Sequence, residues 1–203
     1  MSWKKFIPKE IQELYEIHDY KHAAAILSKE FPVEFKEICE ALKHFRFSTH
    51  DIIAGGGNES AIPKIMSKVL RGQGWNERSL EAELVVYEVK GKTRTESHRV
   101  KHGTHKVDFL KGRIAFDFEW NSKDQTFDRD LSAFRSFFEY DAISVAVIVT
   151  RSTGLNAIFK ELDIMKKYGA STTHMDKLIP RLEAGRNGGC PVLVFGITER
   201  QII

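Results

Sequence analysis

Apolar and polar residues alternate through residues 106–120, in two stretches separated by Lys111-Gly112. Side chains of a β-strand point alternately to opposite faces, and Lys-Gly suits a two-residue turn because glycine adopts positive φ easily. The pattern therefore predicts a hairpin in which Asp108 lies opposite Ala115. One face of this hairpin is entirely apolar and must be buried; it consists of Val107, Phe109, Ile114, Phe116, Phe118 and Trp120.

The chain after this hairpin alternates between helical and strand patterns. Apolar residues recur at helical spacing over 127–138, and residues 142–150 form a nearly continuous apolar run that is typical of a strand buried on both faces. Further helices are predicted over 153–167 and over 175–182, the second with an N-cap from Ser171-Thr172-Thr173, before a last strand over 191–197. Together these elements predict an α/β fold with a mixed central β-sheet flanked by helices.

The chain before the hairpin is mainly helical in pattern. Helices are predicted over 8–27, 35–45 and 60–71, while Gly55-Gly-Gly57 indicates a connector or a loop that orders against DNA. Residues 80–89 are rich in β-formers and are expected to enter the sheet, and residues 90–101 form a polar, basic, hairpin-like segment suited to phosphate contact or to a solvated edge. We expect a single domain, 1–203, with a mainly helical N-terminal part (1–74) and a catalytic core (75–203).

Three carboxylates occupy the polar face of the predicted hairpin: Asp108, Asp117 and Glu119. Clustered carboxylates repel one another unless a cation lies between them, and Mg²⁺ prefers such oxygen ligands together with phosphate oxygens. Asp, eight residues, then Asp-x-Glu is similar to the PD-(D/E)xK nuclease pattern, with Val107 in place of Pro and Glu119 in place of Lys. The alternative is an acidic, solvent-facing hairpin whose carboxylates pair with nearby cations.

Three segments are informative together: the strand 108–117, the closing segment 178–197 and the aromatic landmark Gly72-Gln-Gly-Trp75. With them the chain resembles, over about 75–197, the restriction endonucleases of the BglII, BstYI and BamHI group. Two positions depart from the group: Asp117 stands where Glu is common, and Glu119 is Gln in the BglII and BstYI type but Glu in the BamHI type. The resemblance also places a first ligand two or three residues after the Trp, which makes Glu77 the candidate.

The resemblance implies a restriction-endonuclease-like core and a type II restriction enzyme. Such an enzyme would act as a homodimer on double-stranded DNA and cut each strand of a short palindromic site with one or two Mg²⁺ ions per active site. We expect Asp108 to bridge the metal or metals and to hold the scissile phosphate, and Asp117 to be a second ligand. Glu119 would bind metal or take a proton from the attacking water, and Glu77 would complete the site.

Candidate DNA contacts lie beside these carboxylates. The resemblance places Asn121, Ser122 and Lys123 near the bases, and Lys and Asn are common partners of guanine and adenine in the major groove. Further candidates are the residues directly before the catalytic strand and those of the loop 168–174: His105, Lys106, Ser171, Thr172 and Thr173.

Composition agrees with an enzyme of ordinary size. The chain has 203 residues, a net charge of +3 and two cysteines, Cys39 and Cys190, too distant in sequence to indicate a disulfide framework. The sequence has neither a signal-peptide stretch nor an apolar run long enough to cross a membrane, so we expect a cytoplasmic protein. No Gly-x-Ser-x-Gly elbow, Walker loop or dinucleotide fingerprint is present, and the spacing of His98, His102 and His105 does not suit a zinc site.

Two other functions remain open from the sequence. One is a structure-selective repair or junction nuclease of the same superfamily, and the other is a noncatalytic DNA-binding protein that retains the nuclease core. Dependence on Mg²⁺ separates the catalytic functions from the noncatalytic one.

Overall fold

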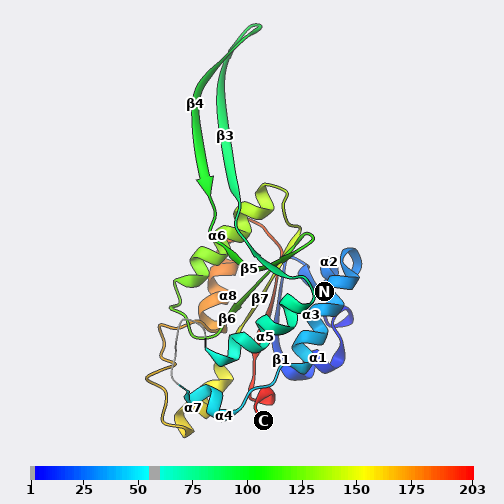
Figure 1. Cartoon of the computed structure of the whole chain (residues 1–203), viewed down its shortest axis with the longest axis vertical. Helices are drawn as coiled ribbons and strands as arrows, with labels where there is room; N and C mark the ends of the chain where they lie inside the picture. The colour runs from blue at the N-terminus through cyan, green and yellow to red at the C-terminus, as the bar shows by residue number, and fades with distance from the viewer. Residues whose placement is uncertain (1–2, 55–59) are drawn as a thin grey trace.

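A mixed, six-stranded β-sheet forms the centre of the molecule (Figure 1). The computed structural model describes residues 3–54 and 60–203. Strands β6, β7 and β8 are mutually parallel, whereas β1, β5 and β2 join the sheet through antiparallel pairings. In spatial order the strands are β1 (Tyr15–Tyr20), β8 (Val192–Ile197), β7 (Val145–Arg151), β6 (Ile114–Glu119), β5 (Val107–Lys111) and β2 (Asn76–Arg78).

Helices cover both faces of the sheet, which confirms the predicted α/β class. Along β7, Val145, Val147 and Val149 pack in the core that contains the N-terminal helices, whereas Ala146 and Ile148 pack with α6 and α8. The α-helices are α1 (Lys9–Leu14), α2 (Ala23–Glu30), α3 (Pro32–His44), α4 (Thr49–Ile53), α5 (Ala61–Gly72), α6 (Thr126–Glu139), α7 (Asn156–Glu161) and α8 (Met175–Glu183). Short 3-10 turns complete the described elements: η1 (Trp3–Phe6), η2 (Thr153–Leu155) and η3 (Glu199–Gln201).

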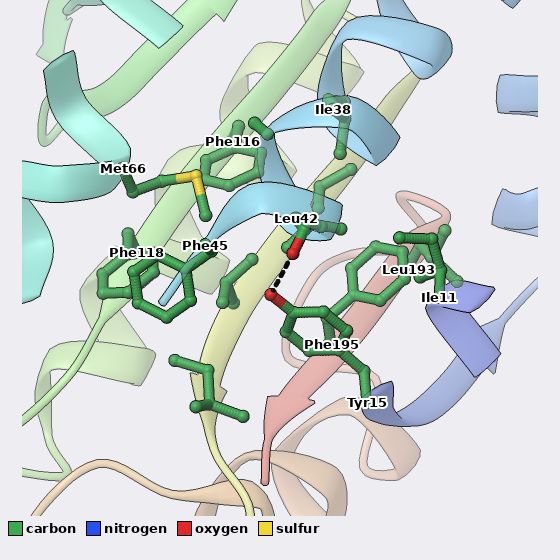
Figure 2. Packing of buried hydrophobic residues seen from close by; sticks show 14 of the residues in the cluster. Ile11, Tyr15, Ile38, Leu42, Phe45, Met66, Phe116, Phe118, Leu193 and Phe195 are labelled. Carbon is green, nitrogen blue, oxygen red and sulfur yellow. Dashed lines mark hydrogen bonds between the residues drawn. The ribbon is translucent and has the colours of Figure 1, made fainter. Parts of the chain in front are cut away.

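The N-terminal segment departs from the sequence prediction. A continuous helix over 8–27 is wrong, because β1 interrupts it and pairs with the edge of β8. Figure 2 shows how the start of this strand is held: the hydroxyl of Tyr15 donates a hydrogen bond of 2.8 Å to the carbonyl of Leu42 in α3, and its ring packs edge-on against Phe195 of β8. Tertiary pairing thus outweighs a helical pattern in a segment too short to decide by periodicity alone.

The predicted catalytic hairpin forms, with a different register. Lys111 pairs with Ile114 and Leu110 with Ala115, so the turn is Gly112-Arg113 rather than Lys111-Gly112, and the expected pairing of Asp108 with Ala115 is wrong. Gly112 does adopt positive φ (54°), but as the first rather than the second residue of the turn. A shift of two residues leaves the side chains of the hairpin on their predicted faces, with the exception of Val107 at the start of β5.

Figure 1 shows a long two-stranded hairpin projecting from the body of the molecule. It consists of β3 (Glu81–Lys90) and β4 (Thr93–Gly103), which pair with each other in a separate sheet. The prediction that residues 80–89 enter the central sheet is therefore wrong, whereas the prediction of a hairpin-like segment over 90–101 is confirmed. Apolar residues are divided between the two faces of β3, so this strand presents no single face that the central sheet could bury.

Three smaller expectations have mixed outcomes. The helix predicted over 153–167 ends at Glu161, close to Asp163, whose backbone has a positive φ of 53°. The helix α8 matches its prediction, but His174 is its N-cap residue without a side-chain cap bond, so the expected cap is wrong. Val107 packs on the α6 side of the sheet rather than with Phe109.

The expectation about Gly55-Gly-Gly57 falls outside the described residues. No helix within 3–54 and 60–203 is long and apolar enough to span a membrane.

Candidate active site

Asp108 and Asp117 lie next to each other on adjacent strands. The backbone N–H of Asp108 donates a 2.7 Å hydrogen bond to Oδ1 of Asp117, and the backbone N–H of Phe118 donates a 3.1 Å bond to Oδ2 of Asp108. Each carboxylate is thereby tied to the backbone at the other strand. The sheet itself, rather than a mobile loop, fixes the positions of these two groups.

A fourth carboxylate, absent from the sequence prediction, faces this pair from helix α6. Asp130 is 3% exposed, and burial together with the negative charges of Asp117, Glu119 and Asp108 raises its pKa to about 10. Its position in the sequence carried a signal, because it is three residues after Phe127 and so belongs to the apolar stripe of the helix. An aspartate on such a stripe is rarely buried without a partner or a function.

Burial also governs the other carboxylates of the cluster. Burial, with the charge of Asp108 as the next cause, raises the pKa of Asp117 well above its usual value. Burial and the charge of Asp108 likewise raise the pKa of Glu119 to about 7, against the lowering effects of a hydrogen bond from Ser122 and of the Arg129 charge. One oxygen in each of Asp117, Glu119 and Asp130 is buried without a hydrogen-bond partner.

A cleft of about 480 Å³ opens beside the cluster. Asp108, Glu119 and Glu77 contribute to its wall, and two cationic residues, Arg71 and Lys167, line it as well. Nζ of Lys167 donates a 2.8 Å bond to the carbonyl of Ile52. The cleft therefore combines acidic oxygen donors with positive charge, a combination suited to a phosphate group and its cation.

Glu77 reaches the cleft from strand β2. Its carboxylate forms an ion pair with Nζ of Lys106 at 2.8 Å, and this hydrogen bond lowers the pKa of Glu77. Lys106 and the neighbouring His105 are exposed directly before β5. The structure thus places Glu77 at the same cleft as Asp108 and Glu119, with a lysine as its present partner.

The two segments predicted to contact DNA lie side by side. Lys123 pairs with Thr172 in an isolated β-bridge, and the N–H of Thr173 donates a 2.9 Å bond to the carbonyl of Ser122. Ser122, Lys123 and Ser171 are exposed, whereas the side chain of Thr173 is fully buried. Asn121 lines the cleft.

Arg151 holds these two segments together and was not identified from the sequence. It is only 1% exposed, and its guanidinium donates to the Trp120 carbonyl at 2.6 Å and to Oγ1 of Thr172 at 2.5 Å. The rings of Tyr168 and Phe159 surround it at 5.0 and 5.4 Å, and burial lowers the pKa of Arg151 to about 10. The sequence did contain a signal for this residue, because Arg151 is a single charged residue at the end of an apolar strand.

A ready-made metal centre is absent from the described part of the chain: no group of three or more His, Cys, Asp or Glu side chains there is arranged to hold an ion. Mg²⁺ usually takes only one or two protein carboxylates and completes its shell with water and substrate phosphate. The cluster supplies oxygen donors alone, which suits a hard cation, and the partnerless oxygens of Asp117 and Glu119 are the kind of atom that such a cation satisfies.

This combination of mixed sheet, hairpin carboxylates and cleft agrees with the result of sequence comparison. Residues 15–197 match the family described as restriction endonuclease BglII/BglIII. The chain belongs to this family. It is accordingly a type II site-specific deoxyribonuclease, a DNA-binding hydrolase of a restriction–modification system, and it acts on double-stranded DNA. No curated protein matches the chain in a direct sequence comparison.

The match confirms the resemblance found in the sequence and the restriction-endonuclease-like fold. It extends that resemblance, because it begins at the first residue of β1 and includes most of the helical N-terminal part.

Proposed function

We propose that this BglII-family enzyme hydrolyses one phosphodiester in each strand of a short palindromic DNA site, in a reaction that depends on Mg²⁺. The observation that supports the proposal most directly is the reciprocal attachment of Asp108 and Asp117 to the β5–β6 hairpin, with Glu119 at the adjoining cleft. Rigid placement of charged groups is what phosphoryl-transfer sites require, because most of their effect is positioning and electrostatic stabilisation.

Restriction endonucleases of this family generally use Mg²⁺. Asp108, Asp117 and Glu119 are the residues that would hold it, with Glu77 joining from β2 when Lys106 exchanges that carboxylate for a phosphate. When bound, the ion supplies Lewis-acid polarisation of the phosphoryl group. Arg71 and Lys167 would add positive charge at the wall of the cleft.

Glu119 is the proposed acceptor of the proton from the attacking water. A carboxyl group with a pKa of about 7 is half ionised near neutral pH, and general bases work best when their pKa lies near the working pH. Glu119 lines the cleft, where its carboxylate would take the proton, while the hydrogen bond from Ser122 orients the group. A glutamate at this position can perform this step, whereas the usual lysine would instead contribute charge.

Base and backbone contacts are proposed for the surface that adjoins the cleft. The exposed residues Ser122, Lys123 and Ser171 stand together there, so a single region of DNA could meet both segments. Asn121 lines the cleft and Thr172 pairs with Lys123, while Lys106 reaches the cleft through its ion pair with Glu77; we propose contacts for these residues and for the neighbouring His105. A homodimer would present this surface twice, and a twofold protein matches a twofold site.

The test is digestion of a long unmodified duplex by the wild type and by Asp108→Asn, with Mg²⁺ or with EDTA. We expect discrete fragments from the wild type only with Mg²⁺, and no cleavage by Asp108→Asn, which should bind DNA as well as the wild type or better because a charge facing phosphate is removed. Asp163→Asn, at an exposed position in the turn after α7, is the matched control and should cut normally.

Other outcomes contradict the proposal in different ways. Equal cleavage by Asp108→Asn and the wild type would remove Asp108 from the mechanism. A Mg²⁺-dependent smear without discrete bands would contradict a fixed palindromic site and indicate a structure-selective or nonspecific nuclease.

A further inference from the structure

The β3–β4 hairpin, which we call the arm, extends well beyond the body of the molecule (Figure 1). Eleven residues of β4 span roughly 35 Å at about 3.3 Å per residue. Every residue of β4 is exposed, and β3 and β4 have no other strand partner among the described residues. A two-stranded hairpin in water is only marginally stable, so an arm of this length is expected to act with a partner.

The root of the arm is closed by two hydrogen bonds and lies a few residues from the active site in sequence. The N–H of Leu80 donates a 2.8 Å bond to Oγ1 of Thr104, and the N–H of Thr104 donates a 2.9 Å bond to the Leu80 carbonyl. Three residues before Leu80 is Glu77, and four residues after Thr104 is Asp108. The direction of the arm is therefore set within a few residues of two groups at the cleft.

Positive charge is concentrated at the tip of the arm. Lys90, Lys92 and Arg94 are exposed, the segment 89–95 contains no acidic residue, and none of the three cations forms an ion pair within the described chain. Arg99, nearer the root, is by contrast neutralised by two glutamates at 2.7 and 3.0 Å. Three cations therefore gather within five residues at the tip, without an ion-pair partner in the described chain.

The apolar residues of the arm do not form one protein-binding face. Leu84 lies opposite Val100 on one face, whereas Tyr87 and Val89 point to the other. Arg94 covers the ring of Tyr87, with its guanidinium 3.6 Å from the ring centre. A stable protein interface buries about 800 Å² on each partner, which a ribbon with divided apolar residues does not offer.

We propose that the arm lies along the duplex and that its tip binds backbone phosphates about one helical turn from the cleaved site, through Lys90, Lys92 and Arg94. The proposal rests on the DNA-cutting function above and adds a second point of contact to it. The length of the arm is close to the roughly 34–36 Å of one turn of DNA, and a two-stranded ribbon has the width that a major groove admits. Lysine, arginine and threonine are the usual phosphate partners, and Thr93 and Thr95 flank the cations.

The test compares the wild type with the triple variant Lys90→Gln, Lys92→Gln, Arg94→Gln. Binding is measured by fluorescence anisotropy in EDTA, on duplexes that carry the mapped site with either about 3 or about 15 base pairs on each side, and in parallel on duplexes of unrelated sequence. The control variant removes three exposed lysines from the N-terminal helices: Lys9→Gln, Lys29→Gln, Lys36→Gln.

On the long duplex we expect the arm variant to bind at least about tenfold more weakly. The slope of log affinity against log salt should fall by about 0.9 for each lost phosphate contact, which is up to about 2.7 for each arm and up to about 5.4 for a homodimer with both arms on the DNA. On the short duplex it should match the wild type, because the tip has no DNA to reach. The control variant should show neither the length dependence nor the loss of slope.

Equal long-duplex binding by the arm variant and the wild type would overturn the proposal, even if cleavage occurs as proposed. If the protein cuts no DNA but its binding depends on duplex length and on the tip cations, the proposed DNA contact of the arm would be supported and the proposed cleavage function would be contradicted. A third outcome would assign the arm to contact with a second copy of the chain. In that case Leu84→Asp would dissociate the dimer while the arm variant bound DNA as the wild type does, and the proposal would be overturned.

Discussion

Replacing Asp130 by asparagine should stabilise the metal-free enzyme at alkaline pH. In the unfolded chain this carboxyl releases its proton near its ordinary pKa of 3.8, whereas the folded protein raises the value to about 10. The unfolded state therefore binds fewer protons than the native state between these values, and the free energy of unfolding falls as pH rises. Asparagine does not titrate, so the variant should not lose this part of its free energy of unfolding as pH rises.

The size of the effect follows from the shift. Each unit of pKa corresponds to about 1.4 kcal/mol, so at pH 8 the ceiling for one group is about 6 kcal/mol. The charges of Asp117 and Glu119 contribute to this shift, and the new amide needs hydrogen-bond partners of its own, so the gain should be well below the ceiling. We expect Asp130→Asn to gain about 2–3 kcal/mol at pH 8 and almost nothing at pH 4, measured by urea unfolding in EDTA.

Asp128 provides a matched control on the same helix with the opposite sign. Burial opposes ionisation there, but hydrogen bonds from Arg181 and Arg186 lower its pKa on balance. Asp128→Asn should therefore destabilise the protein at pH 8, and its effect should fade as pH falls below about 4. A gain for Asp130→Asn that is the same at pH 4 and pH 8 would refute the electrostatic reasoning and point to packing instead.

Two further substitutions test the supports of the site. Arg151→Lys should cost about 2–3 kcal/mol, because a lysine cannot satisfy both the Trp120 carbonyl and Thr172 Oγ1; thermal unfolding measures the loss, and a variant as stable as the wild type would contradict it. Gly112→Ala should cost about 1 kcal/mol from its φ of 54° alone, since the nearest atom to the added Cβ, at 3.7 Å, leaves room for it; a loss above about 3 kcal/mol would indicate a clash instead.

The sequence allowed the β5–β6 hairpin to be predicted because its alternation is strong and its carboxylates are regularly spaced. The wrong turn still preserved the faces of the paired residues, since a register error of two residues returns a side chain to the same side of the sheet. The buried strand β7 and the helix α6 were predictable for a similar reason. A long segment with one consistent hydrophobic pattern, such as 127–138, fits only one type of secondary structure well.

The parts that could not be predicted depend on contacts distant in sequence. Strand β1 exists because β8 offers it an edge, about 180 residues later in the chain. Asp130 and Arg151 look like minor exceptions within apolar patterns, and their surroundings become apparent only when α6 and the loop 168–174 are placed against the sheet. Burial of a charged residue is a property of the assembled fold. The sequence can therefore show that a charged residue interrupts an apolar pattern, but not which groups will surround it.

The cost of the carboxylate cluster and its function have the same physical origin. Burial and the neighbouring carboxylates raise the pKa values of Asp117, Glu119 and Asp130, each of which has a partnerless buried oxygen, and this weakens the metal-free fold. A divalent cation converts that repulsion into attraction, so the destabilisation measured without metal is also a source of affinity for metal. The same variant that stabilises the metal-free enzyme, Asp130→Asn, should therefore gain less from added Mg²⁺ than the wild type, because it has less repulsion to relieve.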